Sequence, residues 1–318
     1  MGIDCLCIGG AAVDRSFRLV GPAVLGTSNI ASSDSGLGGV ARNVAESLAR
    51  LGARTALLTA VGADPAGWEL VERLTAIGVD AGLVQVVPGG TTAEYVAVLD
   101  PDGELVIGVN AMDVIARLGP EDVAEAPLEE ARWVFAECNL GADALAAVIG
   151  HRRAGGGFRL AVDAISVAKA ARLPADLSGV DLLCGNADEA NAILGTDRPP
   201  TLEGALLLAR GLVERGAAAA MVSIGAAGCV VASGAAAWSI GAVPARVVDV
   251  TGAGDARIAG TIAALLDGEP IELAARRGSL LAALAAESPA TIDPALTRQR
   301  VAALSGRLAE AAITELPS

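Results

Sequence analysis

The stretch that decides the fold is Val247–Leu266, which reads VVDVTGAGDARIAGTIAALL. A β-branched run breaks into Gly-Ala-Gly-Asp and then resumes as a segment rich in Ala, Ile and Leu. This order predicts a glycine turn at 252–254 that leads directly into a helix beginning at about Asp255 or Ala256. The free N–H groups of a helix N-terminus form an anion site, and glycines allow a ligand to approach these groups closely. Phosphate is the expected ligand.

Asp255 is an acidic side chain at this predicted anion site, where a carboxylate beside a phosphate is repulsive. The local pattern leaves two interpretations open. Asp255 is either a helix N-cap, for which Asp is a favoured residue type, or a general base that accepts the proton of a hydroxyl attacking a phosphoryl group. General bases of this kind contribute about a hundred- to ten-thousandfold in rate.

Outward from this stretch, the chain alternates strands and helices. Residues 3–10 read as a buried strand that ends in glycine, and Val40, Val44, Leu48 and Leu51 recur at helical spacing. Such alternation predicts an α/β fold with a central, mostly parallel sheet flanked by helices. Further strands are expected at 55–61, 133–136, 159–164, 180–184, 219–224 and 229–232, and a further helix at 67–78.

A hairpin interrupts this rhythm. The apolar runs 92–99 and 104–109 flank Asp100-Pro101-Asp102-Gly103, a turn sequence with Pro and Gly in favourable places. A hairpin does not belong to a βαβ crossover, so we expect a small β-sheet lid over a cleft, formed by about 15–35 and 91–110. No repeat or low-complexity linker divides the chain, and one domain is expected over 1–318.

Composition narrows the class of protein. The net charge of −14 disfavours nucleic acid and anionic membrane surfaces as partners, since both attract basic patches. The five cysteines are scattered through apolar runs, as expected for reduced thiols of a cytoplasmic protein. No signal peptide is visible at the start. Residues 216–245 lack any charge, but their glycines and serines favour short strands and turns over a membrane span.

Two common nucleotide-binding motifs are missing. No Gly-x-x-x-x-Gly-Lys-Ser/Thr loop occurs, which excludes the usual P-loop kinase, and Gly9-Gly10 lacks the Gly-x-Gly-x-x-Gly spacing of dinucleotide-binding folds. Lys169 is the only lysine, so chemistry through a Schiff base is not expected. Any phosphoryl transfer must therefore use another scaffold.

Two distant motifs together resemble one family. Gly-Gly-Val-Ala-Arg-Asn at 38–43 and Asp-Val-Thr-Gly-Ala-Gly-Asp at 249–255 are similar to motifs of the ribokinase-like (PfkB) family of carbohydrate and nucleoside kinases. The resemblance extends over essentially the whole chain and includes the hairpin, which matches the family's β-sheet lid. It implies a ribokinase-like fold, ATP and Mg²⁺ as cofactors, and a small-molecule nucleoside or sugar as the acceptor.

The resemblance also implies roles for individual residues. Asp255 is the expected catalytic base. The residues implied for the anion hole are Gly252, Ala253 and Gly254, and those for binding the acceptor substrate are Asp14, Gly38, Gly39, Asn43 and Asn139. The residues implied for nucleotide binding are Asn186, Ser223, Gly225 and Gly228. Glu189 is expected to organise Mg²⁺, in part through water, and Asp249 and Thr251 fit a monovalent-cation site for K⁺.

For several of these positions a purely structural role is the alternative interpretation. Asn186 and Glu189 are equally typical of a solvated helix start, and the stretch 223–228 of an ordinary hairpin. Asn139, or a lid residue near Thr92 or Tyr95, is a candidate contact of a base. Arg257 stands where the family usually has an apolar residue, and it either points to solvent or meets a phosphate.

Within the family, the stretches 39–43, 110–114, 138–140 and 163–169 are most similar to the pseudouridine kinase branch. The expected activity is therefore ATP-dependent phosphorylation of the 5′-hydroxyl of pseudouridine. The alternatives are a kinase for ribose, adenosine or another sugar or nucleoside, and a non-catalytic ligand-binding protein on the same fold. Because lids that pair across two chains are common in this family, a homodimer is expected.

Overall fold

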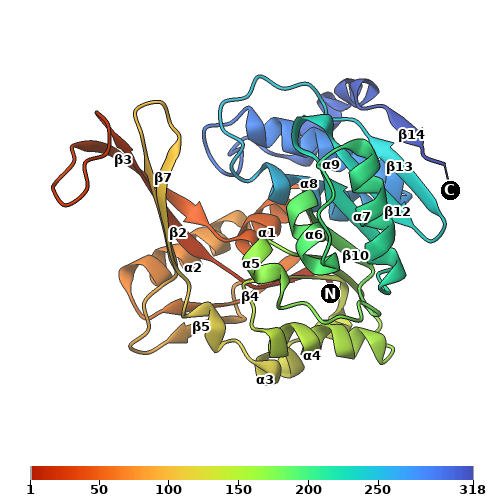
Figure 1. Ribbon diagram of the computed structural model, residues 1–318. Coiled ribbons are helices and arrows are strands. Elements are labelled where there is room, and N and C mark those ends of the chain that lie inside the picture. The colour runs from red at the N-terminus through yellow and green to blue at the C-terminus, as the bar shows by residue number, and fades with distance from the viewer. Residues whose placement is uncertain (1, 318) are drawn as a thin grey trace.

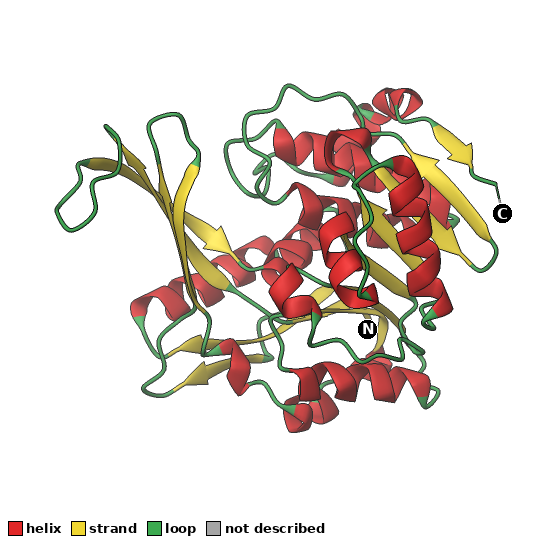
Figure 2. Ribbon diagram, in the orientation of Figure 1, coloured by secondary structure: helices red, strands yellow, loops and turns green. Residues whose placement is uncertain are grey.

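The computed structural model describes residues 2–317. Its main element is a ten-stranded sheet (Figure 2). Neighbouring strands from β5 to β11 are parallel, and β12, β13 and β14 extend the sheet antiparallel. The order is β14 (Ile313–Glu315), β13 (Ala236–Ile240), β12 (Cys229–Ser233), β11 (Ala219–Ser223), β10 (Leu182–Asn186), β9 (Arg159–Asp163), β8 (Ala131–Glu137), β1 (Ile3–Ile8), β4 (Thr55–Gly62) and β5 (Val84–Val87). The predicted α/β class is confirmed.

Helices cover both faces of this sheet, and each face has its own apolar core. One core includes side chains of α3 (Pro120–Glu125), α4 (Ala142–Arg153), α6 (Ala187–Leu194) and α7 (Leu202–Glu214). The other includes side chains of α1 (Val40–Arg50), α2 (Pro65–Ile77), α8 (Ala253–Leu266), α9 (Ile271–Ala286) and α10 (Arg298–Ala303). Strands buried on both faces explain the nearly continuous apolar runs in the sequence.

Helices α8 and α9 pack closely because small residues meet between them. A Cβ atom added to Gly260 would lie 3.0 Å from the Cα of Gly278. The short helix α5 (Val167–Ala170) follows β9, and short 3₁₀ helices occupy Ile115–Arg117, Leu128–Glu130, Gly225–Ala227 and Ser305–Glu310. None of the helices described is both long and apolar enough to cross a membrane. Residues 216–245 form strands and turns, as predicted.

A second, four-stranded sheet stands off the main body (Figure 1). Its order is β3 (Ala31–Gly38), β2 (Ala12–Leu19), β6 (Glu94–Leu99) and β7 (Leu105–Ala111). β6 and β7 form the expected hairpin, whose turn is closed by Gly103 N–H donating to the Asp100 carbonyl over 3.1 Å. The sheet therefore brings together two distant segments of the chain, and Val13 on β2 is paired with Glu94 on β6.

Two local predictions need correction. Helix α8 begins at Ala253, so Gly252 is its N-cap and Asp255 lies in the first turn; the interpretation of Asp255 as the N-cap is wrong. Gly252 takes this position because its φ of 77° is left-handed. The strand expected at 180–184 is Leu182–Asn186 instead, because Val180 belongs to a turn in which its N–H donates to the Leu177 carbonyl.

Candidate active site

The sequence-predicted residues meet at the carboxyl edge of the parallel strands. Gly9 and Gly10 follow β1, Asn139 follows β8, Asp163 ends β9, Asn186 ends β10 and Ser223 ends β11. Strand order therefore places the two glycines and Asn139 toward one end of the site and Asn186 and Ser223 toward the other. Ligands of open α/β sheets bind outside this edge.

Asp255 meets a side chain from a distant motif. Asn43, on α1, donates from Nδ2 to Oδ2 of Asp255 over 2.6 Å. Asn43 itself is buried, and its Oδ1 atom has no hydrogen-bond partner in the part of the chain that the structure describes. A buried acceptor without a donor costs free energy, and a hydroxyl group of a ligand would satisfy it. The two motifs that suggested the family therefore converge on one point.

The environment of Asp255 makes its carboxylate a stronger base than usual. Burial raises its pKa to about 6, and the nearby carboxylates of Glu137 and Asp14 act in the same direction. The hydrogen bond from Asn43 and the charge of Arg42 partly oppose this rise. A base with a pKa near 6 is ionised at neutral pH and still holds a proton well enough to assist its transfer.

This pKa predicts the acid limb of the pH profile. A general base at this position accepts a proton only when it is ionised, so the acceptor's kcat/KM should fall about tenfold per pH unit below pH 6. Asn43→Leu removes a hydrogen bond that lowers the pKa of Asp255, so its acid limb should move to higher pH. Steady-state rates between pH 4.5 and 8 provide the measurement. A wild-type profile that stays flat down to pH 5 would contradict the role of Asp255.

The loop at Gly38 and Gly39 is shaped by close contacts. Gly39 is the N-cap of α1 with a φ of 91°, and an added Cβ would lie 2.6 Å from the Cα of Ala11. At Gly38, an added Cβ would occupy the space of the Asp14 carboxylate. Burial raises the pKa of Asp14, and the positive charge of Arg42 opposes the rise. Only glycines allow this carboxylate to face the loop.

Arg42, whose role the sequence alone did not reveal, anchors this loop. Its guanidinium is buried and forms an ion pair with Glu46 one turn along α1. It also donates to the carbonyl oxygens of Leu37 and of Gly38, the latter over 3.2 Å. Arg42 thus ties the last residues of β3 to the start of α1.

Asn139 is held by a buried network at the end of β8. Its Nδ2 donates to Oε1 of Glu137 over 3.1 Å, and its Oδ1 accepts from Nζ of Lys169. Glu137 is completely buried and accepts the N–H groups of Gly10 and Asn139. The sequence pattern gave no sign of Glu137, since one acidic residue at the end of an apolar run resembles any solvated strand end.

A cavity of about 180 Å³ lies on the other side of Asp255. Asn186 and Glu189 form its wall through a reciprocal capping box: Asn186 Oδ1 accepts from Glu189 N over 2.9 Å, and Glu189 Oε2 accepts from Asn186 N over 2.8 Å. Glu189 is buried, whereas Asn186 at the N-cap of α6 is exposed. The lining residues are Val40, Asp163, Ile165, Cys184, Gly185, Asn186, Glu189, Met221, Ser223, Gly254, Asp255, Arg257 and Ile258.

Carboxylates make this cavity attractive to a cation. Burial raises the pKa of Asp163 well above its usual range, and the charges of Glu189 and Asp255 raise it further. Ile165, just beyond Asp163, has a φ of 66°, a strained conformation for a β-branched residue. Asp163 was not among the predicted site residues. A cation would relieve the mutual repulsion of these carboxylates.

Within residues 2–317, no three or more His, Cys, Asp and Glu side chains are arranged to hold a metal ion. Mg²⁺ does not require such a cluster, because it usually keeps several waters and takes one or two protein carboxylates together with phosphate oxygens. Glu189 and Asp163 are the carboxylates that fit this pattern at the cavity. Asp249 and Thr251 are exposed, and Asp249 Oδ1 accepts from Thr251 N over 2.8 Å within their loop.

Gly225 and Gly228 lie in the tight connection between β11 and β12. Gly225 has a φ of 62° and Gly228 a φ of 104°, and Gly228 N–H donates to the Gly225 carbonyl over 3.1 Å. β11 and β12 are antiparallel neighbours, so the stretch is also the hairpin that the alternative interpretation expected. The turn adjoins Ser223, which places it beside the cavity.

Arg257 and Thr92 have internal partners. Arg257 is only 8% exposed, so the suggestion that it points to solvent is wrong; its Nη1 donates to the Ser279 hydroxyl of α9 over 3.0 Å. The Thr92 hydroxyl donates to Asp64 Oδ1 over 2.6 Å and accepts from Gly62 N over 3.0 Å. Thr92 therefore stabilises the start of α2.

All five cysteines are free and buried, as predicted.

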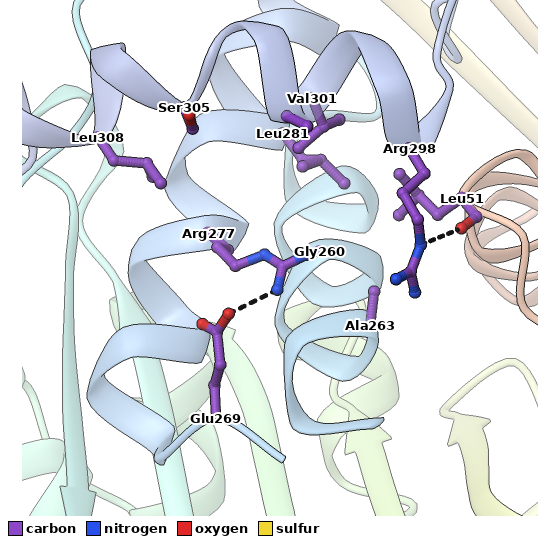
Figure 3. Close-up of a pocket in the computed structure, with 11 residues that line it drawn as sticks. Leu51, Gly260, Ala263, Glu269, Arg277, Leu281, Arg298, Val301, Ser305 and Leu308 are labelled. Atoms are coloured by element: carbon purple, nitrogen blue, oxygen red, sulfur yellow. Dashed lines mark hydrogen bonds and ion pairs between the residues drawn. The ribbon is translucent and has the colours of Figure 1, made fainter. Parts of the chain in front are cut away.

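A larger cavity, of about 400 Å³, lies elsewhere, between the far half of α8, α9 and the C-terminal helices (Figure 3). Arg277 is paired there with Glu269 over 2.6 Å, and Arg298 donates to the Leu51 carbonyl over 3.1 Å. Both arginines also pair with Asp267, and most of the other lining residues are apolar. Asp255, Asn186, Glu189 and Ser223 line the smaller cavity instead.

Fold and site together define a phosphotransferase with an alcohol group as acceptor. The chain belongs to the pfkB family of carbohydrate kinases, whose family model matches residues 3–298. It is 30% identical over 271 residues to a pseudouridine kinase of Escherichia coli (strain K12), an alignment that covers 84% of this chain and 85% of that protein. The confirmed family explains why the two distant motifs converge.

Solved structures support the same fold. A carbohydrate kinase from Agrobacterium tumefaciens superposes with a TM-score of 0.82 at 30% identity, covering 99% of this chain and 100% of that one. A ribokinase of Arabidopsis thaliana, solved with ribose and ATP, superposes with a TM-score of 0.81 at 22% identity, covering 96% and 99%. The ribokinase-like architecture with a separate small sheet is thus confirmed.

Proposed function

We propose that this protein is a kinase that transfers the γ-phosphoryl group of ATP to the 5′-hydroxyl of pseudouridine. The observation that carries the proposal is the contact between Asn43 and Asp255, which joins a hydroxyl-binding motif to a base at a helix N-terminus. The pseudouridine kinase of Escherichia coli is the relative that supports this acceptor. The solved ribokinase with ribose and ATP supports the donor.

The proposed reaction uses groups from both sides of Asp255. Asp14, Gly38, Gly39 and Asn43 bind the sugar hydroxyls, and Asn139 lies at the same end of the site. Asp255 takes the proton of the attacking hydroxyl, and the amides of Gly252, Ala253 and Gly254 stabilise the charge on the transferred phosphoryl group. Glycines at this turn leave the amides open, and the α8 N-terminus favours negative charge.

The nucleotide lies toward the other end in this proposal. Asn186, Ser223, Gly225 and Gly228 contact its phosphates and adenosine, at the ends of β10 and β11. Bound Mg²⁺ would neutralise phosphate charge, and Glu189 and Asp163 are the carboxylates that would hold it. The exposed loop with Asp249 and Thr251 remains the proposed site of K⁺.

The small sheet acts as a lid and as the contact to a second copy in this proposal. Apolar side chains lie exposed along β7, with Leu105 57% and Ile107 55% exposed. An exposed apolar edge strand invites pairing with another chain. A homodimer through the lids would cover these side chains, and sedimentation at several protein concentrations tests it.

A panel of acceptors tests the proposed substrate. Pseudouridine, uridine, adenosine and ribose are each incubated with ATP and Mg²⁺, and ADP formation is measured under steady-state conditions. We expect pseudouridine to have the highest kcat/KM, because Asn139 and its network add a polar, ordered contact beyond the sugar. Turnover of another acceptor without any turnover of pseudouridine would contradict the proposed substrate, but not the proposed kinase activity.

A further inference from the structure

Lys169 stands out because it is the only lysine among 318 residues and lies beside the acceptor end of the site. It belongs to α5, and its Nζ donates to Oδ1 of Asn139, which follows β8. Lys169 is partly buried, which lowers its pKa, whereas the negative charge of Glu137 raises it. Lys169 is not among the residues proposed above to bind the nucleotide.

The amide of Asn139 has a single orientation in this network. An ammonium only donates hydrogen bonds and a carboxylate only accepts them, so Oδ1 must face Lys169 and Nδ2 must face Glu137. One Nδ2 proton then remains without a partner in the network. Asn139 can present this N–H to an acceptor oxygen of a ligand.

Glu137 depends on positive charge nearby. Its carboxylate is completely buried, which raises its pKa, while the N–H groups of Gly10 and Asn139 and the charge of Lys169 lower it. Arg172, the other cation here, donates from Nη1 to the carbonyl oxygens of Cys138, Asn139 and Leu140 over 2.8, 2.9 and 3.2 Å. Its hydrogen bonds thus fix the backbone after β8, and Lys169 is left to balance the carboxylate.

The network also reaches the sugar-binding loop. Glu137 accepts the N–H of Gly10, and the Gly10 carbonyl accepts the N–H of Arg42 over 3.1 Å. A Cβ on Gly10 would lie 2.9 Å from Nδ2 of Asn139, and Gly39 packs directly against the Gly10 carbonyl. A displaced Glu137 would therefore move both Asn139 and the loop that carries Gly39.

We infer that Lys169 is a positioning residue for the acceptor substrate: it holds the Asn139 amide in one orientation and balances the buried charge of Glu137. The inference rests on the proposed function in identifying that acceptor as a nucleoside. Removing the ammonium frees the amide to rotate and leaves a buried carboxylate uncompensated. Acceptor binding is then weakened, while the hydrogen bonds of the nucleotide end stay as they are.

Lys169→Met tests this inference through separate kinetic constants. We expect the KM of the acceptor to rise at least about tenfold, as for loss of a charged hydrogen bond, with kcat and the KM of ATP each within about threefold of wild type. Lys169→Arg keeps the charge and the donor and should recover most of the affinity. Arg73→Met, which removes an exposed ion pair with Glu69 on α2, is the matched control and should change nothing.

A double-mutant cycle separates positioning from general damage. Glu137→Gln removes the carboxylate charge, so Lys169→Met in that background should raise the acceptor KM by less than about threefold. An equal effect of Lys169→Met in both backgrounds, or an equal rise in the KM of ATP, would overturn the inference. Lys169→Gln replaces the methionine variant if the latter does not fold.

Amide hydrogen exchange provides a readout that needs no turnover. The peptide around Gly10 and the peptide around Asn139 should exchange at least about tenfold faster in Lys169→Met, because their N–H groups bond to Glu137. Unchanged exchange there would contradict the inference even if activity fell. If wild type phosphorylates no acceptor in the panel, the proposed function fails, while these exchange rates still decide the role of Lys169.

Discussion

Asp255→Asn is expected to lower kcat by about a hundred- to ten-thousandfold, the range in which a general base contributes. The variant keeps the shape of the side chain but cannot accept the hydroxyl proton. Acceptor binding should persist, because Asn43 can still bond to the amide oxygen at position 255. Steady-state rates with ATP measure the loss of kcat, and calorimetry measures acceptor binding separately.

Stability distinguishes a lost base from a lost fold in this variant. The pKa of Asp255 is raised in the folded protein, so its ionised form destabilises the fold above the carboxylate's ordinary pKa, and the cost persists at neutral pH. Asp255→Asn should therefore melt at or above the temperature of wild type at pH 7. Asp143→Asn, an exposed acid in the first turn of α4, is the matched control and should leave turnover unchanged. Wild-type turnover by Asp255→Asn would refute the assigned role.

Gly39→Ala is the second change with a large expected effect. The φ of 91° is one that residues with a side chain rarely adopt, at a cost of about 1 to 3 kcal/mol. The new Cβ would also lie 2.6 Å from the Ala11 Cα and closer still to the Gly10 carbonyl, both backbone atoms that cannot rotate away. We expect a clearly lower melting temperature and an acceptor KM raised at least about tenfold, with the KM of ATP nearly unchanged.

Gly36→Ala is the control for this change. Gly36 lies on β3 three residues earlier, and an added Cβ would meet no atom within 4 Å. This variant should keep the melting temperature and both KM values of wild type. If Gly39→Ala behaved in the same way as Gly36→Ala, the close packing of the loop against Gly10 would not shape the acceptor site.

Much of the fold could be predicted because its determinants are local in sequence. Apolar runs bounded by glycine marked β1, β4 and β11, and the Pro and Gly of residues 100–103 marked the hairpin turn. The start of α8 was misplaced because a glycine can be an N-cap as well as a turn residue. Sequence spacing does not separate these two uses.

The site was predicted only where its residues belong to motifs. Asp255 and Asn43 were identified through two distant motifs; the residues are 212 positions apart in sequence, and the structure brings them to hydrogen-bonding distance. Glu137 and Asp163 were missed because their importance comes from burial among neighbouring strands. Arg42 was missed for a related reason: its partners are backbone carbonyls of the preceding loop, which leave no pattern of residue types.

The central claim is that this site phosphorylates a nucleoside hydroxyl held against Asp255. The most direct measurement is ³¹P NMR of the product formed by the wild-type protein from pseudouridine, ATP and Mg²⁺, with Asp255→Asn measured in parallel. We expect wild type to form a monophosphate whose phosphorus couples to the two 5′ protons, and we expect this product to be lost in the variant. Phosphate on another hydroxyl, or ATP hydrolysis with no phosphorylated nucleoside, would contradict it.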